Sequence, residues 1–447
     1  MQKITILGSG AAGLSCSYHA GHQNCIIFEK NEYFGGHLYS HQNNGFIWDE
    51  GPHVSFTKIP YVQDLFYKSV KGELLEFSSN VSNWFKGSWI PHPAQSNLFA
   101  APEILRKSCL KDFLKAHKKK DKNKIPRNYE EWLLNAFGET FTKTFPKAYT
   151  KKYWTVEARE LATDWIGNRV YYPKKEDFIN GSKMQLNKQT HYIDKFRYPS
   201  RGGFKSFVNE LRLDSNIKFN HKVSKIDLKN KIIFFNNGKQ HSFERLISTL
   251  PLPELIKIIL NVPPEIKHAA DLLLCSSLLL VNITANHKAL KPYHWLYVYD
   301  DNKLSTRINH IDLLSSGNTP KDKTGVQVEV YFSSKKPLTD DISEIKKKVV
   351  QEVKEMGLII QEESVHTQIV KYANVIFDHN RRSAQNKVLN WLEQFGLERE
   401  DDDLEPITNW QKKCRVKSGN LMLAGRYGQW KYYWSDDCVM RGKVLFN

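Results

Sequence analysis

Three glycines near the start of the chain have the spacing of a phosphate-binding turn. Gly8, Gly10 and Gly13 form the pattern G-x-G-x-x-G in the stretch ILGSGAAGLS. In such a turn the first glycine permits a tight bend, the second lets backbone amides approach a pyrophosphate, and the third lets a helix pack closely on a strand. The pattern predicts a dinucleotide site, to which Ala11 and Ala12 also contribute.

An acidic residue stands at the end of the next apolar run, CIIFEK. Glu29 lies where a carboxylate accepts hydrogen bonds from a ribose hydroxyl, and the neighbouring Lys30 is assigned to the same site. Together with the glycines, Glu29 indicates an adenine dinucleotide with an unphosphorylated ribose, either NAD or FAD.

The elements around this turn give the motif its weight. Residues 3–7 alternate and are rich in β-forming side chains, whereas the residues from Leu14 onward have the apolar spacing of a helix. The turn is therefore expected between a strand and a helix, which is the context that a dinucleotide site requires. Further along, residues 100–170 and 342–357 have helical patterns, and residues 270–335 have β patterns.

Length and composition limit the class of protein. The chain has 447 residues, of which 40% are apolar, so it is a globular protein too long for one ordinary core. No run approaches the ~18 apolar residues of a membrane helix, and the first residues do not have the pattern of a signal peptide, so we expect a cytoplasmic protein. The six cysteines form no CxxC pair, and neither a disulfide framework nor a metal site is predicted.

The chain carries a formal net charge of +17. Nucleic acid, an anionic membrane surface and an anionic small substrate could each match this charge. Part of the excess lies in KAHKKKDKNK, residues 115–124, which we expect to be a solvated helix end or loop. The aromatic residues are not interleaved with lysine and arginine as stacking platforms require, so no nucleic-acid partner is expected. Peripheral contact with a membrane stays open.

Two further stretches carry a family resemblance. EKNEYFGGHLYS places Gly36 and His37 after the acidic residue, and GFIWDEGPHVSF contains the turn Gly51-Pro52-His53. Both resemble segments of the flavin amine oxidase superfamily, whose double glycine lets the loop pass close to FAD and whose later turn reaches the flavin ring. The resemblance favours FAD over NAD.

Three later segments extend this resemblance: RYPSRGGFKSFVNEL, RLISTLPLPEL and NLMLAGRYGQW. They imply that the pair Gly425 and Arg426 meets the cofactor pyrophosphate. They also imply that the closing helix, near Ser435, points its N-terminus at the flavin, where its partial positive charge stabilises an anion. Val223 and Tyr433 are assigned to the same cofactor site.

Because these segments are far apart in the chain, the FAD-binding domain is expected to be discontinuous. We predict an α/β fold with a Rossmann-type FAD-binding domain built from residues 1–75, 195–255 and 405–447. A mainly helical insert over 76–194 and a β-sheet substrate domain over 256–404 complete a flavin amine oxidase-like architecture.

Within the superfamily, the chain resembles the UDP-galactopyranose mutases over nearly its whole length. GSWIPHPAQSN, WIGNRVYYP, HWLYVYDD, FDH and GRYGQWKYYWSDD have counterparts there in the same order. The resemblance implies that N5 of reduced FAD is the nucleophile at the anomeric carbon of a nucleotide-activated sugar. The result would be a pyranose–furanose isomerisation in surface-polysaccharide synthesis, with NAD(P)H as the implied electron donor.

The same resemblance implies the residues of the active site. Catalytic roles fall to His53, beside flavin N5, and to Arg169 and Arg307, because the guanidinium fork suits a diphosphate. Substrate contacts fall to these two arginines and to Gln95, Trp154, Trp295, Tyr297 and Tyr432.

Several of these positions have a structural alternative. Arg169 and Arg307 could serve in ion pairs, the WKYYW stretch around Tyr432 could be aromatic core, and Trp295 and Tyr297 suit an ordinary strand. The chain also departs from the mutases at His92, which replaces a tyrosine of their nucleotide-binding segment.

Other functions stay open beside the mutase. One is an amine oxidase or a protoporphyrinogen oxidase or desaturase, in which oxidised flavin accepts a hydride. Another is a flavin-binding scaffold without catalysis. The basic balance of the chain favours an anionic substrate, such as a nucleotide diphosphate sugar, over an ammonium substrate. The oligomeric state is not indicated.

Overall fold

The glycine turn follows the first strand of a five-stranded parallel sheet. In this computed structural model, which describes residues 3–119, 125–186, 193–408, 410 and 415–446, the strand order is β19-β13-β1-β2-β9. The strands come from three distant parts of the chain: β1 (Ile4–Leu7), β2 (Cys25–Phe28), β9 (Ile217–Lys218), β13 (Arg245–Ser248) and β19 (Leu421–Leu423).

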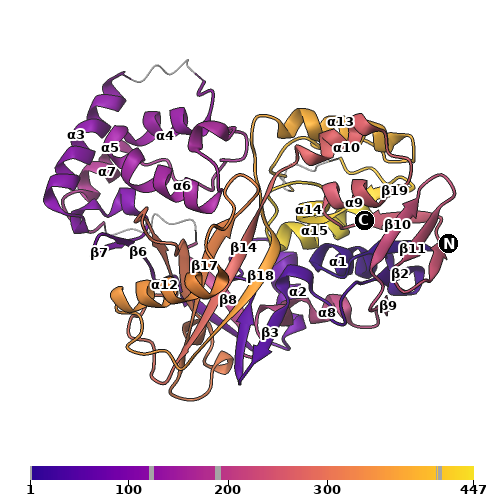
Figure 1. Cartoon of the computed structure of the whole chain (residues 1–447), viewed down its shortest axis with the longest axis horizontal. Coiled ribbons are helices and arrows are strands. Elements are labelled where there is room, and N and C mark those ends of the chain that lie inside the picture. The colour runs from indigo at the N-terminus through magenta and orange to yellow at the C-terminus, as the bar shows by residue number, and fades with distance from the viewer. Residues whose placement is uncertain (1–2, 120–124, 187–192, 409, 411–414, 447) are drawn as a thin grey trace.

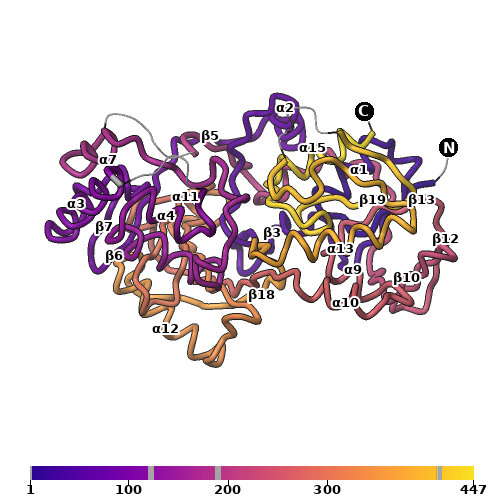
Figure 2. The backbone as a smooth tube through the Cα atoms, turned by 90° about the horizontal axis from the view of Figure 1, so that it is seen from above, coloured from indigo at the N-terminus to yellow at the C-terminus, as the bar shows by residue number. Residues whose placement is uncertain are grey.

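Two helices from opposite ends of the sequence pack beside this sheet. They are α1 (Ala11–Ala20), which begins at the glycine turn, and α15 (Ser435–Phe446). The helices approach so closely that a side chain on Gly442 would fall on Ser15. Figures 1 and 2 show both termini at this end of the molecule. The other elements at this end of the molecule are α8 (Asn209–Arg212), β10 (Val223–Asp227), β11 (Ile232–Phe235), β12 (Gln240–Ser242), α9 (Leu252–Ile258), α10 (Pro264–Asp271), α13 (Arg381–Glu393) and α14 (Gly425–Gly428).

A seven-stranded sheet of order β18-β14-β17-β16-β15-β6-β7 forms the middle of the molecule (Figure 1). Neighbouring strands are antiparallel except β15 and β6, which are parallel. The strands are β6 (Val81–Phe85), β7 (Ser88–Pro91), β14 (Cys275–Ala285), β15 (Trp295–Val298), β16 (Arg307–His310), β17 (Thr324–Phe332) and β18 (Ser364–Val375).

The two faces of this sheet differ in character. Alternate residues of β14 and β17, such as Val281 and Val328, join the apolar side of α12 (Ile342–Glu355), where Val349 and Val353 are buried. The other residues of these strands face the opposite way because side chains alternate along a strand. That second face carries polar groups, among them Gln327.

A cluster of helices occupies the end of the molecule opposite the termini (Figures 1 and 2). Their aromatic core includes Phe113 and Phe178, whose rings stack with centroids 3.8 Å apart. The helices are α3 (Glu103–Lys119), α4 (Tyr129–Phe137), α5 (Glu139–Thr142), α6 (Ala148–Tyr153) and α7 (Lys175–Gly181). Of the basic run 115–124, residues 115–119 end α3, and residues 120–124 lie outside the described residues.

The remaining elements join these parts. They are α2 (Pro60–Ser69), α11 (Ile311–Leu314) and the two-stranded pairs β3 (Ser40–Asn43) with β4 (Phe46–Asp49) and β5 (Leu74–Ser78) with β8 (Lys195–Pro199). Asp49 holds several of them together, because its buried carboxyl accepts hydrogen bonds from Ser40 Oγ (2.5 Å), Tyr198 Oη (2.7 Å) and the backbone N–H of Phe204 (3.0 Å).

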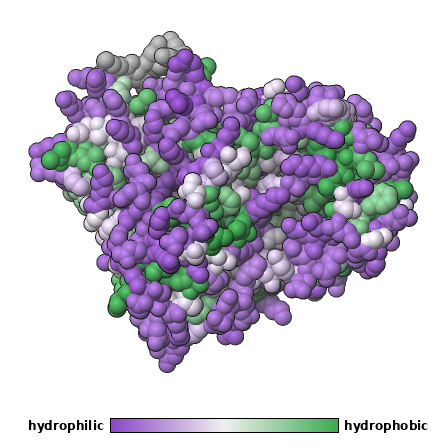
Figure 3. Space-filling model, in the orientation of Figure 1, coloured by the Kyte–Doolittle hydropathy of each residue, from purple (hydrophilic) through white to green (hydrophobic). Residues whose placement is uncertain are grey.

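The parallel dinucleotide-type sheet with its added sheet and helices confirms the predicted α/β class. The domain boundaries stay a prediction; β6 and β7, which lie within the expected helical insert 76–194, join the large sheet. Polar residues dominate the face shown in Figure 3, with apolar patches between them. None of the described helices is long and apolar enough to cross a membrane. The five described cysteines carry free thiols, and Cys414 lies outside the described residues.

Candidate active site

The glycine turn has the geometry of a close approach between a strand and a helix. Gly8 adopts a φ of +96°, which favours glycine, and a side chain on Gly13 would fall on the carbonyl oxygen of Gly8. Gly10 has an ordinary φ of −71°, and a Cβ there would stand 3.8 Å from Gly36 Cα. The backbone beside Gly10, at the start of α1, is therefore open to a ligand while Gly13 is closed by packing. This arrangement fits a pyrophosphate at the N-terminus of α1.

Glu29 lies beside the same turn and is 5% exposed. One carboxylate oxygen accepts hydrogen bonds from the backbone N–H (2.9 Å) and the hydroxyl (2.8 Å) of Ser9, and the other accepts one from the N–H of Asn31 (2.9 Å). These three donors leave one of the roughly four lone-pair sites of the carboxylate for a ribose hydroxyl. Lys30 is exposed, and Val223, also assigned to the cofactor, is half-buried at the start of β10.

The last strand returns the chain to the glycine turn. Gly425 has a φ of +86°, and a Cβ on it would stand 2.8 Å from the Cβ of Ala12, the neighbour of Ala11 in α1. The Arg426 guanidinium donates from Nη2 to Asn374 Oδ1 (2.8 Å), but among the described residues none accepts a hydrogen bond from its buried Nε. A half-buried arginine with a buried, unused donor atom fits an anionic group of a cofactor or substrate.

The Gly51-Pro52-His53 turn follows β4 and lies against β17 of the seven-stranded sheet. His53 Nδ1 is 3.1 Å from the carbonyl oxygen of Gly51, and its ring stacks on Phe204. Burial lowers the pKa of His53 to about 4, and Glu50 and Arg307 act on it in opposite directions. The imidazole is therefore neutral at physiological pH.

Glu50, which no sequence motif marked, directly precedes this turn and is held by several side chains. Its carboxylate meets His37 Nδ1 (2.9 Å) and His41 Nε2 (3.2 Å) and accepts a hydrogen bond from Gln368 Nε2 (3.1 Å). Burial opposes ionisation, but the two histidines outweigh it and hold the pKa of Glu50 at about 2. The spacing of His37 and His41, four residues apart, is the sequence feature that could have predicted this cluster of two histidines and Glu50.

Arg307 lies on the polar face of the large sheet and forms a bidentate ion pair with Glu329. Its Nε and Nη2 atoms donate to the two carboxylate oxygens at 2.7 and 2.8 Å. Glu329 is 1% exposed, and a Cβ added to Gly51 would stand 2.8 Å from Glu329 Oε1. The pair therefore lies against the His53 turn. Arg307 thus realises the ion-pair alternative, and its contact with a diphosphate stays a prediction.

Trp295 and Tyr297 share this face. Tyr297 is opposite Arg307 in the register of β15 and β16, and its hydroxyl accepts a hydrogen bond from Trp295 Nε1 (3.3 Å). The ring of His92 lies 4.6 Å from that of Tyr297, and His92 Nδ1 is 2.9 Å from Asn83 Oδ1. The chain therefore keeps an aromatic pair where His92 departs from the mutase pattern.

Tyr432 lies between two of the arginines. The guanidinium carbon of Arg169 is 4.5 Å from the centre of its ring, and that of Arg426 is 5.1 Å from it. Arg169 also donates to the Tyr432 carbonyl oxygen (2.6 Å) and lies 4.4 Å from the ring centre of Trp434. These are cation–π distances. The structure thus brings Arg169 together with Arg426 and Tyr432, which come from a distant part of the chain.

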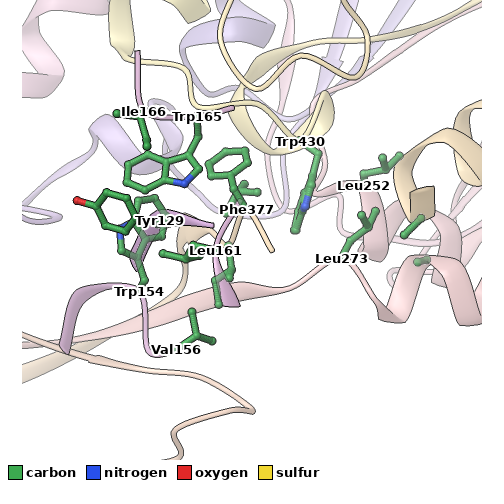
Figure 4. Packing of buried hydrophobic residues seen from close by; sticks show 14 of the residues in the cluster. Tyr129, Trp154, Val156, Leu161, Trp165, Ile166, Leu252, Leu273, Phe377 and Trp430 are labelled. Carbon is green, nitrogen blue, oxygen red and sulfur yellow. The ribbon is translucent and has the colours of Figure 1, made fainter. Parts of the chain in front are cut away.

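Aromatic packing fixes the position of Tyr432. Its ring contacts Trp154, Trp165 and Phe377, at centroid distances of 5.7, 6.2 and 5.7 Å. Trp154 is buried among these rings (Figure 4). Tyr432 therefore borders the aromatic core and faces two cations, and its contact with a substrate stays a prediction.

Asn374, which no sequence motif marked, lies between the Arg426 side of the site and the side that holds the Arg307 pair. Its side-chain oxygen accepts hydrogen bonds from Arg426 (2.8 Å) and from Tyr153 Oη (3.1 Å). Burial raises the pKa of Tyr331, and the Glu329 carboxylate adds to the increase. Tyr331 therefore stays neutral. Tyr153 and Tyr331 are the tyrosines that lie between the Arg307 pair and Arg426. The available sequence signal was a single asparagine in the apolar stretch YANVIF.

For three residues assigned to the cofactor or substrate, the structure shows a partner within the protein or a place at the end of a helix. Gln95 donates to the carbonyl oxygen of Tyr171 (3.3 Å). The buried hydroxyl of Tyr433 is 3.0 Å from that of Thr408. Ser435 begins α15. For Gln95, Tyr433 and Ser435, a role toward a ligand stays a prediction.

One family model matches nearly the whole chain. Residues 11–443 match the family described as flavin containing amine oxidoreductase. A probable UDP-galactopyranose mutase of Klebsiella pneumoniae is 26% identical over 168 residues, which are 36% of this chain and 43% of that protein. The alignment thus spans less than half the length of this relative.

Solved structures share the fold over nearly the whole chain. A reduced UDP-galactopyranose mutase has a TM-score of 0.88 at 24% identity, with 99% of this chain and 92% of that chain covered. A putative protoporphyrinogen oxidase from Exiguobacterium has a TM-score of 0.72 at 15% identity, with 100% and 98% covered. The chain is a flavoenzyme, and it belongs to the family of flavin-containing amine oxidoreductases.

Proposed function

We propose that the protein binds FAD and isomerises a nucleotide-activated sugar between its pyranose and furanose forms, as its similarity to UDP-galactopyranose mutases suggests. The observation that carries the proposal is the convergence of Arg169 and Arg426 on the ring of Tyr432. Arg307 lies on the neighbouring sheet face.

Charge separates this function from amine oxidation. An ammonium substrate would enter beside guanidinium groups of like charge, which repel it, whereas a diphosphate would be attracted and could form bidentate hydrogen bonds. Arg426 has a buried donor ready for such a group. The same charges favour an anionic substrate over an amine. This preference does not depend on which sugar the anionic substrate carries.

The residues around the cofactor position have separate tasks in this proposal. When bound in reduced form, FAD supplies a nucleophile for the anomeric carbon. Arg169 holds the diphosphate while it leaves and returns, and Arg426 offers its buried donor to the cofactor pyrophosphate or to that diphosphate. Tyr432 keeps both guanidinium groups in place. The neutral imidazole of His53 donates its Nδ1–H to the Gly51 carbonyl, so its Nε2 can accept one hydrogen bond near the flavin without adding charge.

The test measures substrate binding and turnover on the same preparations. Holoenzyme is titrated with UDP, GDP and dTDP by flavin fluorescence, with and without anaerobic dithionite reduction. Interconversion of UDP-galactopyranose and UDP-galactofuranose is followed by chromatography. The proposal expects the enzyme to bind UDP, and it expects turnover only after the flavin has been reduced. Oxygen uptake with amines, and no response to any nucleotide, would contradict it.

A variant pair makes the test specific to the site. Arg169→Ala should weaken nucleotide binding by about 10- to 100-fold, because a hydrogen bond to a charged group contributes about 1.5–3 kcal/mol. Arg159→Ala removes an exposed arginine of the same region and is the matched control. Equal affinities for the two variants would remove Arg169 from the diphosphate site.

A further inference from the structure

The outward face of α3 carries a line of basic side chains. Ile104, Lys107, Lys111, Lys115 and Lys118 are all exposed and are spaced three or four residues apart, so they share one side of the helix. From Ile104 to Lys118 this line is about 21 Å long at the helical rise per residue.

The opposite side of α3 is fixed in the protein. Cys109 and Phe113 are buried, and the ring of Phe113 stacks on that of Phe178. Asp112 is also turned inward, where its carboxylate accepts hydrogen bonds from the N–H (3.2 Å) and hydroxyl of Thr140. The helix therefore presents its lysines outward on a rigid support.

The positive charge of this face is only partly neutralised. Lys107 pairs with Glu103 at 2.6 Å. Over the part of the chain that the structure describes, no ion pair involves Lys111, Lys115 or Lys118. Figures 1 and 2 both show α3 at the outer edge of the molecule, away from the termini.

We propose that this face of α3, residues Ile104, Lys107, Lys111, Lys115 and Lys118, docks on an anionic lipid surface. Four lysines in one line match the charge of anionic headgroups, and such basic clusters bind acidic lipids. Ile104, which is 84% exposed, extends the line with an apolar side chain that can enter the headgroup region.

The chemistry of the face favours lipid over nucleic acid. Its five residues include no aromatic ring for base stacking and no arginine for bidentate readout of bases. The arginine next to it, Arg106, donates instead to the carbonyl oxygen of Phe99 (3.3 Å). An exposed isoleucine also has no partner on a phosphate backbone, whereas a bilayer offers one.

Vesicle binding by the full-length holoenzyme tests the proposal. Sedimentation is compared between vesicles of phosphatidylcholine alone and vesicles containing phosphatidylglycerol, at low and high salt. The proposal expects binding only to the anionic vesicles, and weaker binding at high salt. Equal binding to both kinds of vesicle, or binding to neither, would overturn it.

Two triple variants locate the contact. Lys111→Gln/Lys115→Gln/Lys118→Gln should bind anionic vesicles about 100-fold more weakly, at about fivefold per lysine. Lys346→Gln/Lys347→Gln/Lys348→Gln removes the same charge from α12, where Lys347 and Lys348 are already paired with Glu344 and Asp340, and should keep most of the binding. Equal losses would show attraction by net charge alone and would overturn the docking face.

Further variants separate the partners and guard against misfolding. Ile104→Asn should weaken vesicle binding several-fold but leave binding to duplex DNA unchanged. If the lysines of α3 instead support tighter binding to DNA than to vesicles, the lipid proposal is wrong. Flavin content and circular dichroism report folding, and single Lys111→Gln and Lys115→Gln variants, each about fivefold weaker, replace the triple variant if it misfolds.

Discussion

Arg307 and Glu329 face each other across β16 and β17 and form a bidentate ion pair on the polar face of the large sheet. Glu329 has almost no contact with water, and the His53 turn lies against it. One carboxylate therefore positions the arginine and borders the turn. This relationship makes the pair part of the site's framework as well as a local salt bridge.

Breaking this pair should be costly for the fold. Glu329→Ala leaves a guanidinium that is largely buried without its partner, and we expect the free energy of unfolding to fall by about 3–5 kcal/mol. Glu405→Ala breaks the exposed pair with Arg382 and should change it by less than about 1 kcal/mol. Denaturant unfolding of both variants checks this, and equal effects would show that burial of the pair contributes nothing.

Tyr432 should matter through its ring more than through its hydroxyl. Tyr432→Phe keeps both cation–π contacts, so nucleotide affinity should fall only a few-fold. Tyr432→Leu loses two contacts of about 0.5–2 kcal/mol each, so affinity should fall about tenfold or more. Tyr61→Phe, which removes only a hydroxyl near His19 outside the predicted site, is the control and should leave UDP titrations unchanged. Equal losses for the Phe and Leu variants would assign the role to the hydroxyl.

Two glycines of the same turn should respond differently to alanine. Gly13→Ala drives a methyl group into the Gly8 carbonyl, so the chain should fail to fold stably. Gly10→Ala meets only ordinary contacts and an allowed φ, so the apoprotein should fold. The new methyl group would still occupy the approach to the pyrophosphate. We expect a folded protein with little bound flavin, measured by the flavin-to-protein ratio; normal flavin content would place the pyrophosphate elsewhere.

Asp49 should make stability depend on pH. Burial raises its pKa from 3.8 to about 6, against the hydrogen bonds from Ser40 and Tyr198. The folded state therefore binds this proton more tightly than the unfolded state, and stability falls as pH rises from about 4 to about 6, by up to about 3 kcal/mol.

Asp49→Asn isolates that contribution, because the amide has a similar shape and no charge in this range. The difference in unfolding free energy between the two proteins should change between pH 4 and 6 and be constant above about pH 7. A difference that does not vary with pH would mean that Asp49 ionises in the fold as it does in water.

Local patterns were sufficient to predict the strand, glycine turn and helix that form the expected cofactor site. The turn Gly8 to Gly13, the strand before it and Glu29 are close in sequence, and each obeys a spacing rule set by backbone geometry. Periodicity also predicted the helices within residues 100–170 and 342–357 and the strands within residues 270–335, but not β6, β7, β18 or α13. The assigned roles of Val223, Tyr433 and Gln95 depended on resemblance alone, because nothing local distinguishes these positions from ordinary packing.

The sequence by itself thus determined that the chain holds a dinucleotide, and it named the arginines and aromatic residues available to a substrate. Only the tertiary structure decided which of them meet. Arg169 and Tyr432 are 263 positions apart, and Arg307 meets a Glu329 that no motif marked. The physical reason is that charge pairing and ring stacking act between side chains that are neighbours in space. Sheet register and helix packing set those neighbours, and residue spacing along the chain does not encode them.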